Sequence, residues 1–338
     1  MTHPATLDSP RKRTRARRPA AQLMRAAIID RFGPPSALKV RSMPVPSPGP
    51  NEILIAVHSA GVGIWDTEIR HGWWPEGKPK FPLVLGVDGA GIVAAKGSRV
   101  RRFSDGDRVW AYEFINPKGG FYSEYAVVDA RHAGRIPDNF NLLHAGASAA
   151  TGLTAYQGIH DHLRVRSGET VLVFGASGAV GSLAVQFANH QGARVIGLAR
   201  GPHATALVRR LGADLAIDAQ EGDFIDRLRD AAGDGIDGIL ALAGGNQLEA
   251  CLEFVRKGGR VVHPNGVEPA PHRRKNLRVT SYDAKAGIRQ FDALKAAAEA
   301  CDLQVALGGV FPLAQASKAH EELEKGQVLG RLALKILR

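Results

Sequence analysis

The chain has 338 residues, 44% of them hydrophobic and 23% charged, which is enough to bury a large core and suggests two domains rather than one. Glycine, proline or a charge interrupts every apolar run before the roughly 20 residues that span a bilayer, and the N-terminus has no apolar secretory core. We therefore expect a cytoplasmic protein without a membrane segment. Its two cysteines, Cys251 and Cys301, are too few for a disulfide framework or a four-cysteine zinc site.

The formal net charge of +11 is unevenly distributed along the chain. Residues 1–23 hold six basic side chains against Asp8 alone, which contributes +5 of that total. Because this segment has almost no apolar content, we predict a disordered basic tail over residues 1–23. The charge raises the alternative of RNA binding, but nucleic acid is not the partner we favour, since much of the excess belongs to the tail.

Short strands broken by glycine and proline follow the tail from Met24 to about residue 143. Turn signals between them are dense, so the pattern predicts a compact, mostly β domain over residues 24–143. The first predicted strand begins at Met24, and further strands are predicted at residues 53–57, 91–95, 107–111 and 122–128.

Strands alternate with helical stretches from residue 144 to about residue 286. This alternation predicts an α/β domain with a doubly wound parallel sheet. After residue 287 come alanine-rich helical stretches and a final strand over residues 330–336, which could return to the first domain and make it discontinuous. The strands predicted for the sheet are residues 170–174, 194–199, 215–218, 238–241, 260–263 and 277–281.

A glycine-rich turn joins the first strand of this sheet to a helix. Small residues in such a turn let backbone N–H groups approach a pyrophosphate, and the positive end of the helix faces the anion. Ala176 stands where the first glycine of G-x-G-x-x-G would be, and alanine is tolerated there if its backbone is not left-handed. Gly181 allows the helix to lie close to the strand. The predicted cofactor-binding residues of the turn are Ala176, Ser177, Gly178, Ala179 and Val180.

The end of the second strand of the sheet bears on the choice of dinucleotide. A carboxylate there would accept hydrogen bonds from the ribose and repel a 2′-phosphate, but the strand ends in Ala199 and Arg200. His203 follows, and Arg209 and Arg210 come one or two helical turns later. We therefore predict NADPH/NADP as the cofactor, with Arg200 on the 2′-phosphate. The alternative is that Arg200 is a solvated loop cation.

A series of short motifs runs in order through residues 24–338. The motifs span Ala60–Gly72, Gly86–Gly91, Gly106–Val109, Gly120–Tyr125, Gly152–Tyr156, Gly178–Gly181, Leu211–Asp214, Gly258–Val262 and Gly330–Leu334. Together these motifs resemble the zinc-independent quinone oxidoreductases of the medium-chain dehydrogenase/reductase superfamily, the zeta-crystallin-like group. The resemblance implies a Rossmann domain (144–286) inserted in a GroES-like β-barrel catalytic domain (24–143 and 287–338), with a cleft between them and a homodimer or tetramer.

In the alcohol dehydrogenases of that superfamily, a catalytic zinc is held at positions that correspond here to Gly63, Val87 and a residue near Thr151. None of these can ligate zinc, so no metal site is predicted. Without a Lewis acid the acceptor must itself delocalise the incoming hydride charge, as a quinone or an activated alkene does. The predicted function is NADPH-dependent hydride transfer to such a small-molecule acceptor. The alternatives are a reductase of small acrylates or enals, and a low-activity NADPH-binding protein with RNA affinity through its basic arm.

Candidate catalytic residues are Asp66 and Thr67, which could line the nicotinamide cleft or serve as structural hydrogen-bonding groups, and Tyr112, a possible proton donor. Thr154 matches a residue near the nicotinamide in the resembled family. We also include Gly244 and Gly266 as candidate cofactor-binding residues.

Two further groups of side chains are candidates for a functional role. Trp73 and Trp74 would either form an aromatic wall over a flat acceptor or pack in the β domain. His160 and His162 follow a predicted helix, where side chains two positions apart point in different directions, so they do not suggest a shared metal site.

Overall fold

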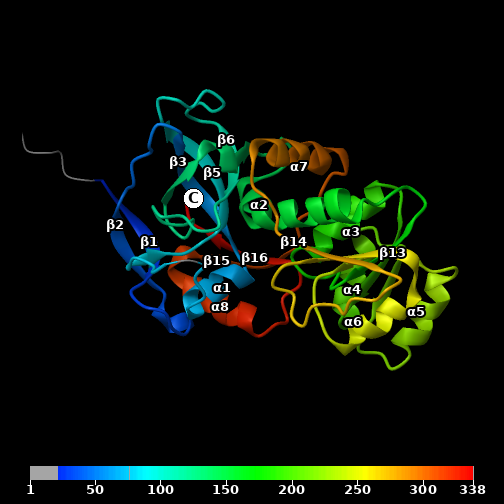
Figure 1. Cartoon of the computed structure of the whole chain (residues 1–338). Coiled ribbons are helices and arrows are strands. Elements are labelled where there is room, and N and C mark those ends of the chain that lie inside the picture. Colours follow the sequence, from blue (N-terminus) through cyan, green and yellow to red (C-terminus); the bar gives the residue numbers. More distant parts are fainter. Residues whose placement is uncertain (1–21, 76, 338) are drawn as a thin grey trace, which may run out of the picture.

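The computed structural model describes residues 22–75 and 77–337, which form two domains (Figure 1). The first domain, blue to cyan and again red, combines the early and late parts of the chain, and the second, green to yellow, contains the middle. Residues 1–21, which hold most of the predicted basic tail, lie outside the described residues. Within the described ranges, no helix combines the length and hydropathy that crossing a membrane requires.

A mixed seven-stranded sheet forms the main part of the first domain, in the order β15-β16-β3-β5-β6-β8 with β7 also paired to β3. The last strand, β16, runs antiparallel to β3, so the end of the chain returns to the first domain. A smaller sheet has the order β2-β1-β4. The strands are β1 (Leu23–Ile29), β2 (Lys39–Pro44), β3 (Glu52–Val62), β4 (Leu83–Val84), β5 (Asp88–Lys96), β6 (Arg108–Tyr112), β7 (Tyr125–Asp129), β8 (Ala133–Arg135), β15 (Leu307–Pro312) and β16 (Arg331–Lys335).

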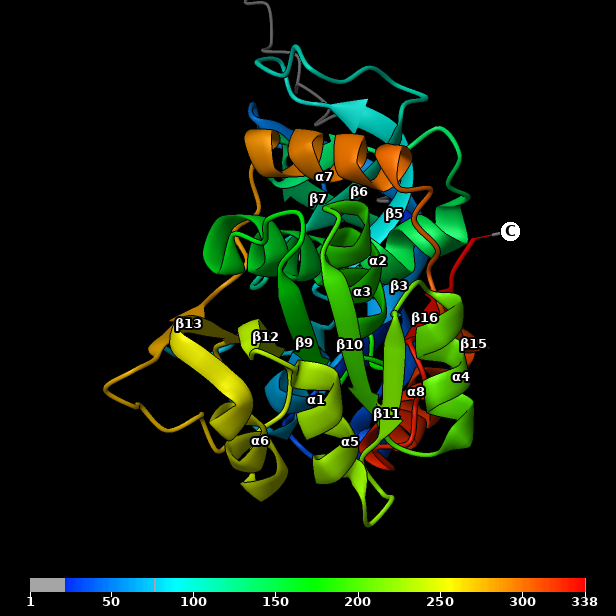
Figure 2. The same cartoon turned by 90° about the vertical axis from the view of Figure 1, so that its right-hand side faces the viewer.

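A parallel six-stranded sheet in the order β11-β10-β9-β12-β13-β14 forms the second domain. Figure 2 shows β9, β10 and β11 side by side. Alternate residues of β9 face different layers, because Val171 and Val173 pack in one apolar cluster whereas Leu172 and Phe174 pack in another. The predicted doubly wound fold is therefore confirmed. The strands are β9 (Thr170–Phe174), β10 (Arg194–Ala199), β11 (Leu215–Asp218), β12 (Ile236–Ala241), β13 (Val255–Pro264) and β14 (Arg278–Tyr282).

Helices cover both sheets, and one of them links the two domains. The side chain of Asn141 caps α2 by accepting a hydrogen bond from the His144 amide at 2.8 Å. This helix packs on β3 and β5 in the first domain and on α3 in the second. The helices are α1 (Ile64–His71), α2 (Leu142–Gln157), α3 (Gly181–His190), α4 (Pro202–Arg210), α5 (Phe224–Ala232), α6 (Asn246–Cys251), α7 (Ile288–Ala300) and α8 (Ala316–Glu324).

The two domains also meet where the glycine-rich turn after β9 touches the start of β16. The amide of Gly330 donates to the carbonyl of Ser177 at 2.8 Å, and Gly178 and Gly330 form an isolated parallel bridge. The turn that follows the first strand of the parallel sheet is thereby fixed against the strand that returns to the first domain.

Candidate active site

The turn between β9 and α3 has the backbone geometry of an anion-binding loop. Gly175, with a φ of +87°, takes the left-handed conformation, and Ala176 does not, so the condition for alanine at that position is met. A Cβ atom on Gly181 would lie 2.2 Å from the Gly175 carbonyl oxygen, so only glycine lets α3 approach the turn this closely. Ala179 and Val180 immediately precede α3, and the positive end of a helix is where a phosphate group is favoured.

The remaining predicted cofactor residues follow other strands of the same sheet. Arg200 comes directly after β10 with an exposed side chain, while Gly244 follows β12 and Gly266 follows β13. All these segments lie at the carboxyl ends of parallel strands, which is where open α/β sheets bind ligands. Arg209 and Arg210 lie at the far end of α4, and the Arg209 guanidinium donates to the Ala216 carbonyl at 3.3 Å. They are therefore separated from Arg200 by the length of that helix.

Thr154 lies on α2 rather than on a loop of the parallel sheet. Its hydroxyl donates to the Ala150 carbonyl one turn earlier at 2.9 Å, and its own carbonyl accepts from the Tyr282 hydroxyl at 2.7 Å. The side chain is half-buried, so it retains some exposed surface at the junction of the two domains.

Two carboxyl groups and one guanidinium lie buried beside the turn that carries Gly330. Asp66 and Asp88 are both fully buried and Arg331 is 8% exposed. Nη2 of Arg331 donates to Oδ1 of Asp88 at 3.0 Å, and Nε of Arg331 has no hydrogen-bond partner among the described residues. This buried charge cluster, Asp66, Asp88 and Arg331, joins α1, β5 and β16 in one place.

Asp66 is held by the backbone rather than exposed to solvent. Its carboxylate accepts from the amides of Gly63 and Val87 at 2.9 and 3.1 Å. Burial raises the pKa of Asp66 to about 7; Arg331 opposes this rise, and Asp88 adds to it. The predicted site residue Asp66 is therefore a buried group whose charge is influenced by both Arg331 and Asp88.

The other two predicted catalytic residues differ in accessibility. The Thr67 hydroxyl donates to the Ile64 carbonyl at 2.7 Å and its side chain is 2% exposed, so it is engaged within α1. Tyr112 pairs with Asp88 across β5 and β6 and is half-buried. Burial, followed by the negative charge of Asp88, raises the pKa of Tyr112, which keeps its phenol protonated at neutral pH.

A buried polar chain extends from Asp66 to the last helix of the first domain. Nε of Arg70 donates to Nδ1 of His320 at 3.2 Å, and Nε2 of His320 lies 3.2 Å from the Tyr122 hydroxyl. The Tyr122 hydroxyl in turn faces Asp66. Because Arg70 can only donate, His320 accepts at Nδ1 and its proton lies on Nε2. Burial and Arg70 lower the pKa of His320 to about 3, so its ring is neutral.

Three aromatic rings meet beside α1, and this aromatic trio consists of Trp65, Trp73 and Phe114. Their centroids are 5.2 to 5.6 Å apart. Trp74, the second tryptophan predicted for an aromatic wall, is not part of the trio and packs against the core of the first domain, as Trp65 and Phe114 also do. Trp65, Asp88 and Arg331 were absent from the candidates based on sequence, because only the tertiary fold brings them to this junction.

Other candidate groups lie apart from these residues. His160 stacks on Tyr156 while His162 stacks on Tyr282, so the two imidazoles face different partners. Over residues 22–75 and 77–337, no group of three or more His, Cys, Asp or Glu side chains is arranged to hold a metal ion.

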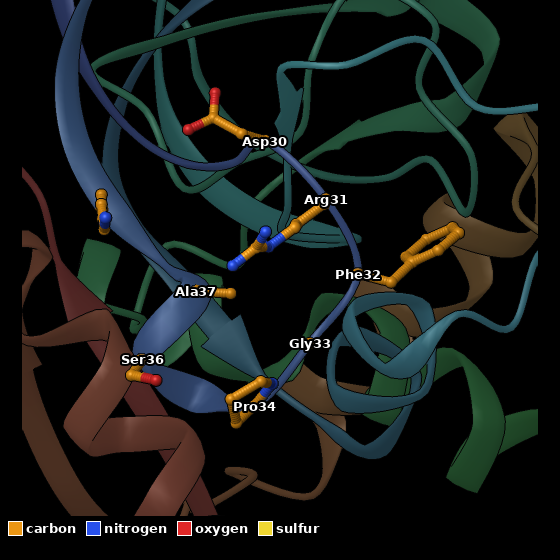
Figure 3. Close-up of a pocket in the computed structure, with 8 residues that line it drawn as sticks. Asp30, Arg31, Phe32, Gly33, Pro34, Ser36 and Ala37 are labelled. Carbon is orange, nitrogen blue, oxygen red and sulfur yellow. The ribbon is translucent and has the colours of Figure 1, made fainter.

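The pocket in Figure 3 is lined by residues between 30 and 39, in and beside the segment joining β1 to β2. None of the predicted site residues lines it.

Similarity to known proteins agrees with this geometry. Residues 49–138 match the alcohol dehydrogenase GroES-like domain, and residues 179–273 match the family described as zinc-binding dehydrogenase. Mouse quinone oxidoreductase is 33% identical over 90% of this chain and 95% of its own length. The chain belongs to the quinone oxidoreductase family of the medium-chain dehydrogenases/reductases. The family resemblance predicted from the sequence motifs is thus confirmed.

Two more relatives show which kinds of enzyme this chain is similar to. Alcohol dehydrogenase 1 of Emericella nidulans is 30% identical, with 92% of this chain and 97% of that protein covered. The structure of Escherichia coli quinone oxidoreductase complexed with NADPH is 26% identical and superposes with a TM-score of 0.81, covering 92% of this chain and 99% of that one. Relatives thus include both quinone reductases and an alcohol dehydrogenase, so the family establishes an oxidoreductase but leaves its substrate to be argued from the site.

Proposed function

We propose that this protein is an NADPH-dependent reductase that transfers a hydride to a quinone or another conjugated acceptor without a catalytic metal. The observation that carries the proposal is that two consecutive residues, Gly330 and Arg331, contact the glycine-rich turn and the buried charge cluster. Gly330 is hydrogen-bonded to the anion-binding turn at Ser177, and the next residue places a buried guanidinium against Asp88. The glycine-rich turn, which we propose holds the cofactor, and a buried guanidinium are therefore adjacent in the structure.

The residues around the turn fit a nicotinamide dinucleotide. The amides before α3 would hold the pyrophosphate, and the exposed Arg200 after β10 would hold a 2′-phosphate. The NADPH complex of the Escherichia coli relative supports this assignment. When bound, the reduced nicotinamide supplies a hydride.

The residues at Gly61 and Gly63 do not fit a catalytic zinc. A Cβ atom on Gly63 would lie 2.5 Å from Nη1 of Arg331, and one on Gly61 would lie 2.7 Å from its Nη2. A cysteine could not occupy either position while the guanidinium is there, and a buried guanidinium repels a second cation. Arg331 therefore takes the space and the positive charge that a metal would supply, and we derive no step through zinc.

The roles of the protein's own groups follow from this arrangement. Reduction of a quinone needs one hydride and one proton, and negative charge develops on the acceptor oxygen. Arg331 would contribute positive charge toward that position, set against the negative charge of its partner Asp88. Tyr112, half-buried and kept protonated by its raised pKa, would donate a hydrogen bond to the same oxygen.

An acceptor panel tests the proposal against the alternatives in the family. We expect NADPH oxidation with quinones and conjugated enones, and none with unconjugated aldehydes or ketones. NADH should support a lower rate at the same concentration. Oxidation of simple alcohols by NAD, or failure to oxidise NADPH with any quinone or enone, would contradict it. Preferential reduction of small acrylates or enals would favour that narrower alternative.

We also propose a homo-oligomer. Strand β14 (Arg278–Tyr282) is the terminal strand of the parallel sheet, and its side chains are mostly exposed. An edge strand with free backbone groups is a surface on which a second copy can extend the sheet. Light scattering coupled to gel filtration tests this: a single-chain mass at micromolar concentration would contradict it.

A further inference from the structure

We infer that the pocket of Figure 3 is an anion site, in which Arg31 and Lys39 bind the phosphate group of a small molecule. The pocket belongs to the first domain, in the segment that joins β1 to β2. None of the residues assigned above to the cofactor or to the acceptor lines it. The inference therefore does not depend on the proposed function, and it adds a second binding site to the chain.

Strand pairing closes the backbone around this pocket. Ile28 of β1 pairs with Lys39 of β2, so the loop between them has two fixed ends. A 3₁₀ helix (Pro35–Ala37) shapes the loop, and the amide of Ala37 donates to the carbonyl of Pro34 at 2.9 Å. Because two consecutive prolines restrict the backbone, the loop has little conformational freedom to lose when a ligand binds.

Gly33, which also lines the pocket, connects the loop to the buried polar chain. Its amide donates to the carbonyl of Arg70 at 3.0 Å, and its carbonyl accepts from Nη1 of Arg70. Arg70 is fully buried on α1 and forms an ion pair with Glu324 of α8. The wall of the pocket is therefore fixed to two helices of the first domain.

Two cationic side chains of this pocket lack a counter-charge. Arg31 and Lys39 are exposed, and neither side chain is ion-paired or hydrogen-bonded to another residue that the structure describes. Figure 3 shows the Arg31 guanidinium reaching across the pocket toward Ala37. The acidic residue of the lining, Asp30, already accepts from the Arg41 guanidinium at 3.0 and 2.6 Å. Two uncompensated positive charges therefore line one space, which favours an anion there.

The charges and the size of the pocket indicate the class of ligand. A phosphate group carries close to two negative charges at neutral pH and can match both cations, whereas a carboxylate matches only one. A guanidinium can donate two parallel hydrogen bonds to phosphate oxygens, and a lysine ammonium adds a point charge. The pocket volume of about 470 Å³ lies in the range of small-molecule sites, and Pro34 and Ala37 contribute apolar lining. A phosphate ester with a small organic body therefore fits better than free phosphate.

Isothermal titration calorimetry with phenyl phosphate and with inorganic phosphate tests the site, near pH 8 and at constant ionic strength. The protein is kept in excess NADP, so that the proposed cofactor turn is not open to either probe. We expect one phenyl phosphate to bind per chain, more tightly than inorganic phosphate. Tighter binding of inorganic phosphate would identify free phosphate as the occupant of the same site. Absence of binding by both probes would overturn the inference.

Substitutions separate this pocket from the general positive charge of the chain. Arg31→Gln and Lys39→Gln should each weaken phenyl phosphate binding about tenfold or more, as expected for the loss of a charge-assisted hydrogen bond. Asp30→Asn should instead strengthen binding, because it removes a negative charge from the lining.

Arg289→Gln is the matched control for these variants. Arg289 is an exposed residue of α7, its side chain also has no ion-pair or hydrogen-bond partner among residues 22–75 and 77–337, and it does not line the pocket. This control should leave the affinity for phenyl phosphate unchanged. An equal loss in Arg289→Gln, or native affinity in Arg31→Gln, would overturn the inference.

The native protein distinguishes this inference from the proposed function. Binding of phenyl phosphate without NADPH oxidation by any quinone or enone would overturn the proposed function alone. Reduction of quinones by a protein that binds neither phosphate probe would overturn the inference alone.

Discussion

The glycine-rich turn after β9 and the buried charge cluster are neighbours in the structure, but they are built in opposite ways. The turn consists of consecutive residues, Gly175 to Gly181, whose backbone conformation and small size are what matter. The cluster consists of side chains from three distant segments, and Arg331 and Asp88 are 243 positions apart. A site made of backbone is robust to its surroundings, whereas one made of buried charges depends on every member being present.

The largest predicted effect is the loss of the guanidinium from the buried charge cluster. Arg331→Met leaves Asp66 and Asp88 buried without a positive partner, so the free energy of unfolding should fall by about 3–5 kcal/mol near pH 8. The loss should shrink near pH 5, where Asp66, whose pKa is raised to about 7, carries a proton. Urea unfolding at the two pH values measures this. Lys335→Met, an exposed change on the same strand, is the control and should cost little; equal losses for both variants would contradict the account.

The pH dependence of stability should show two buried groups acting against each other. Asp66 holds its proton more tightly when folded, so it lowers the free energy of unfolding as pH rises from 3.8 to about 7. His320 releases its proton more easily when folded, so it raises that free energy as pH rises from about 3 to 6.5. Each contribution is of order 4 kcal/mol over its range.

Substituting either Asp66 or His320 should reveal how the other residue alone makes the free energy of unfolding change with pH. In His320→Gln, stability should fall as pH rises from 4 to 7 more steeply than in the native protein, because Asp66 is then unopposed. In Asp66→Asn, stability should rise over the same interval, because His320 remains. Urea unfolding across this range measures both slopes. Parallel pH profiles for all three proteins would show that these two groups do not set the pH dependence.

Adding a single methyl group at Gly181 should destabilise the glycine-rich turn, because the start of α3 lies closest to the turn backbone there. Gly181→Ala would place a Cβ atom 2.2 Å from the Gly175 carbonyl oxygen, so we expect a loss of about 1–3 kcal/mol in stability and weaker NADPH binding. Gly222→Ala is the matched control, since a Cβ atom there meets no atom within 4 Å. Thermal unfolding and fluorescence titration with NADPH compare the two. Unimpaired NADPH affinity in Gly181→Ala would argue against this turn as the cofactor site.

The smallest predicted effect tests the choice between NADPH and NADH. Arg200→Gln should weaken NADPH binding about ten- to a hundredfold and leave NADH binding nearly unchanged, because only NADPH carries the 2′-phosphate. Arg210→Gln, at the other end of α4, should change neither affinity. Equal losses for both cofactors in Arg200→Gln would assign this side chain to another role.

The same comparison explains what could be predicted from the sequence. Strands β9, β10 and β11 have the predicted bounds, because buried parallel strands are short apolar runs bounded by turns and charges. Strand β2 cannot be predicted from the sequence, because nearly all its residues are exposed and its apolar and polar residues do not alternate. Strand β15 cannot be predicted either, because Gly308, Gly309 and Pro312 interrupt its apolar pattern. Local patterns therefore identified the turn and most of the parallel sheet.

The buried charge cluster and the aromatic trio could not be predicted in the same way. Asp66 was a candidate, but nothing near it in sequence indicates that Arg331 would reach it through the pairing of β16 with β3. Trp73 and Trp74 look equivalent in sequence, yet only Trp73 joins the trio, because Gly72 ends α1 and turns the chain. Such contacts are set by tertiary packing, which no local pattern encodes.

The most direct test of the central claim is a single-turnover measurement on protein freed of metal by a chelator. NADPH and NADPH deuterated at the reactive carbon are each mixed with a naphthoquinone, and oxidation is followed by absorbance. The account predicts that oxidation persists without metal and is slower with the deuterated cofactor. Oxidation that disappears on chelation and returns with stoichiometric zinc would contradict it.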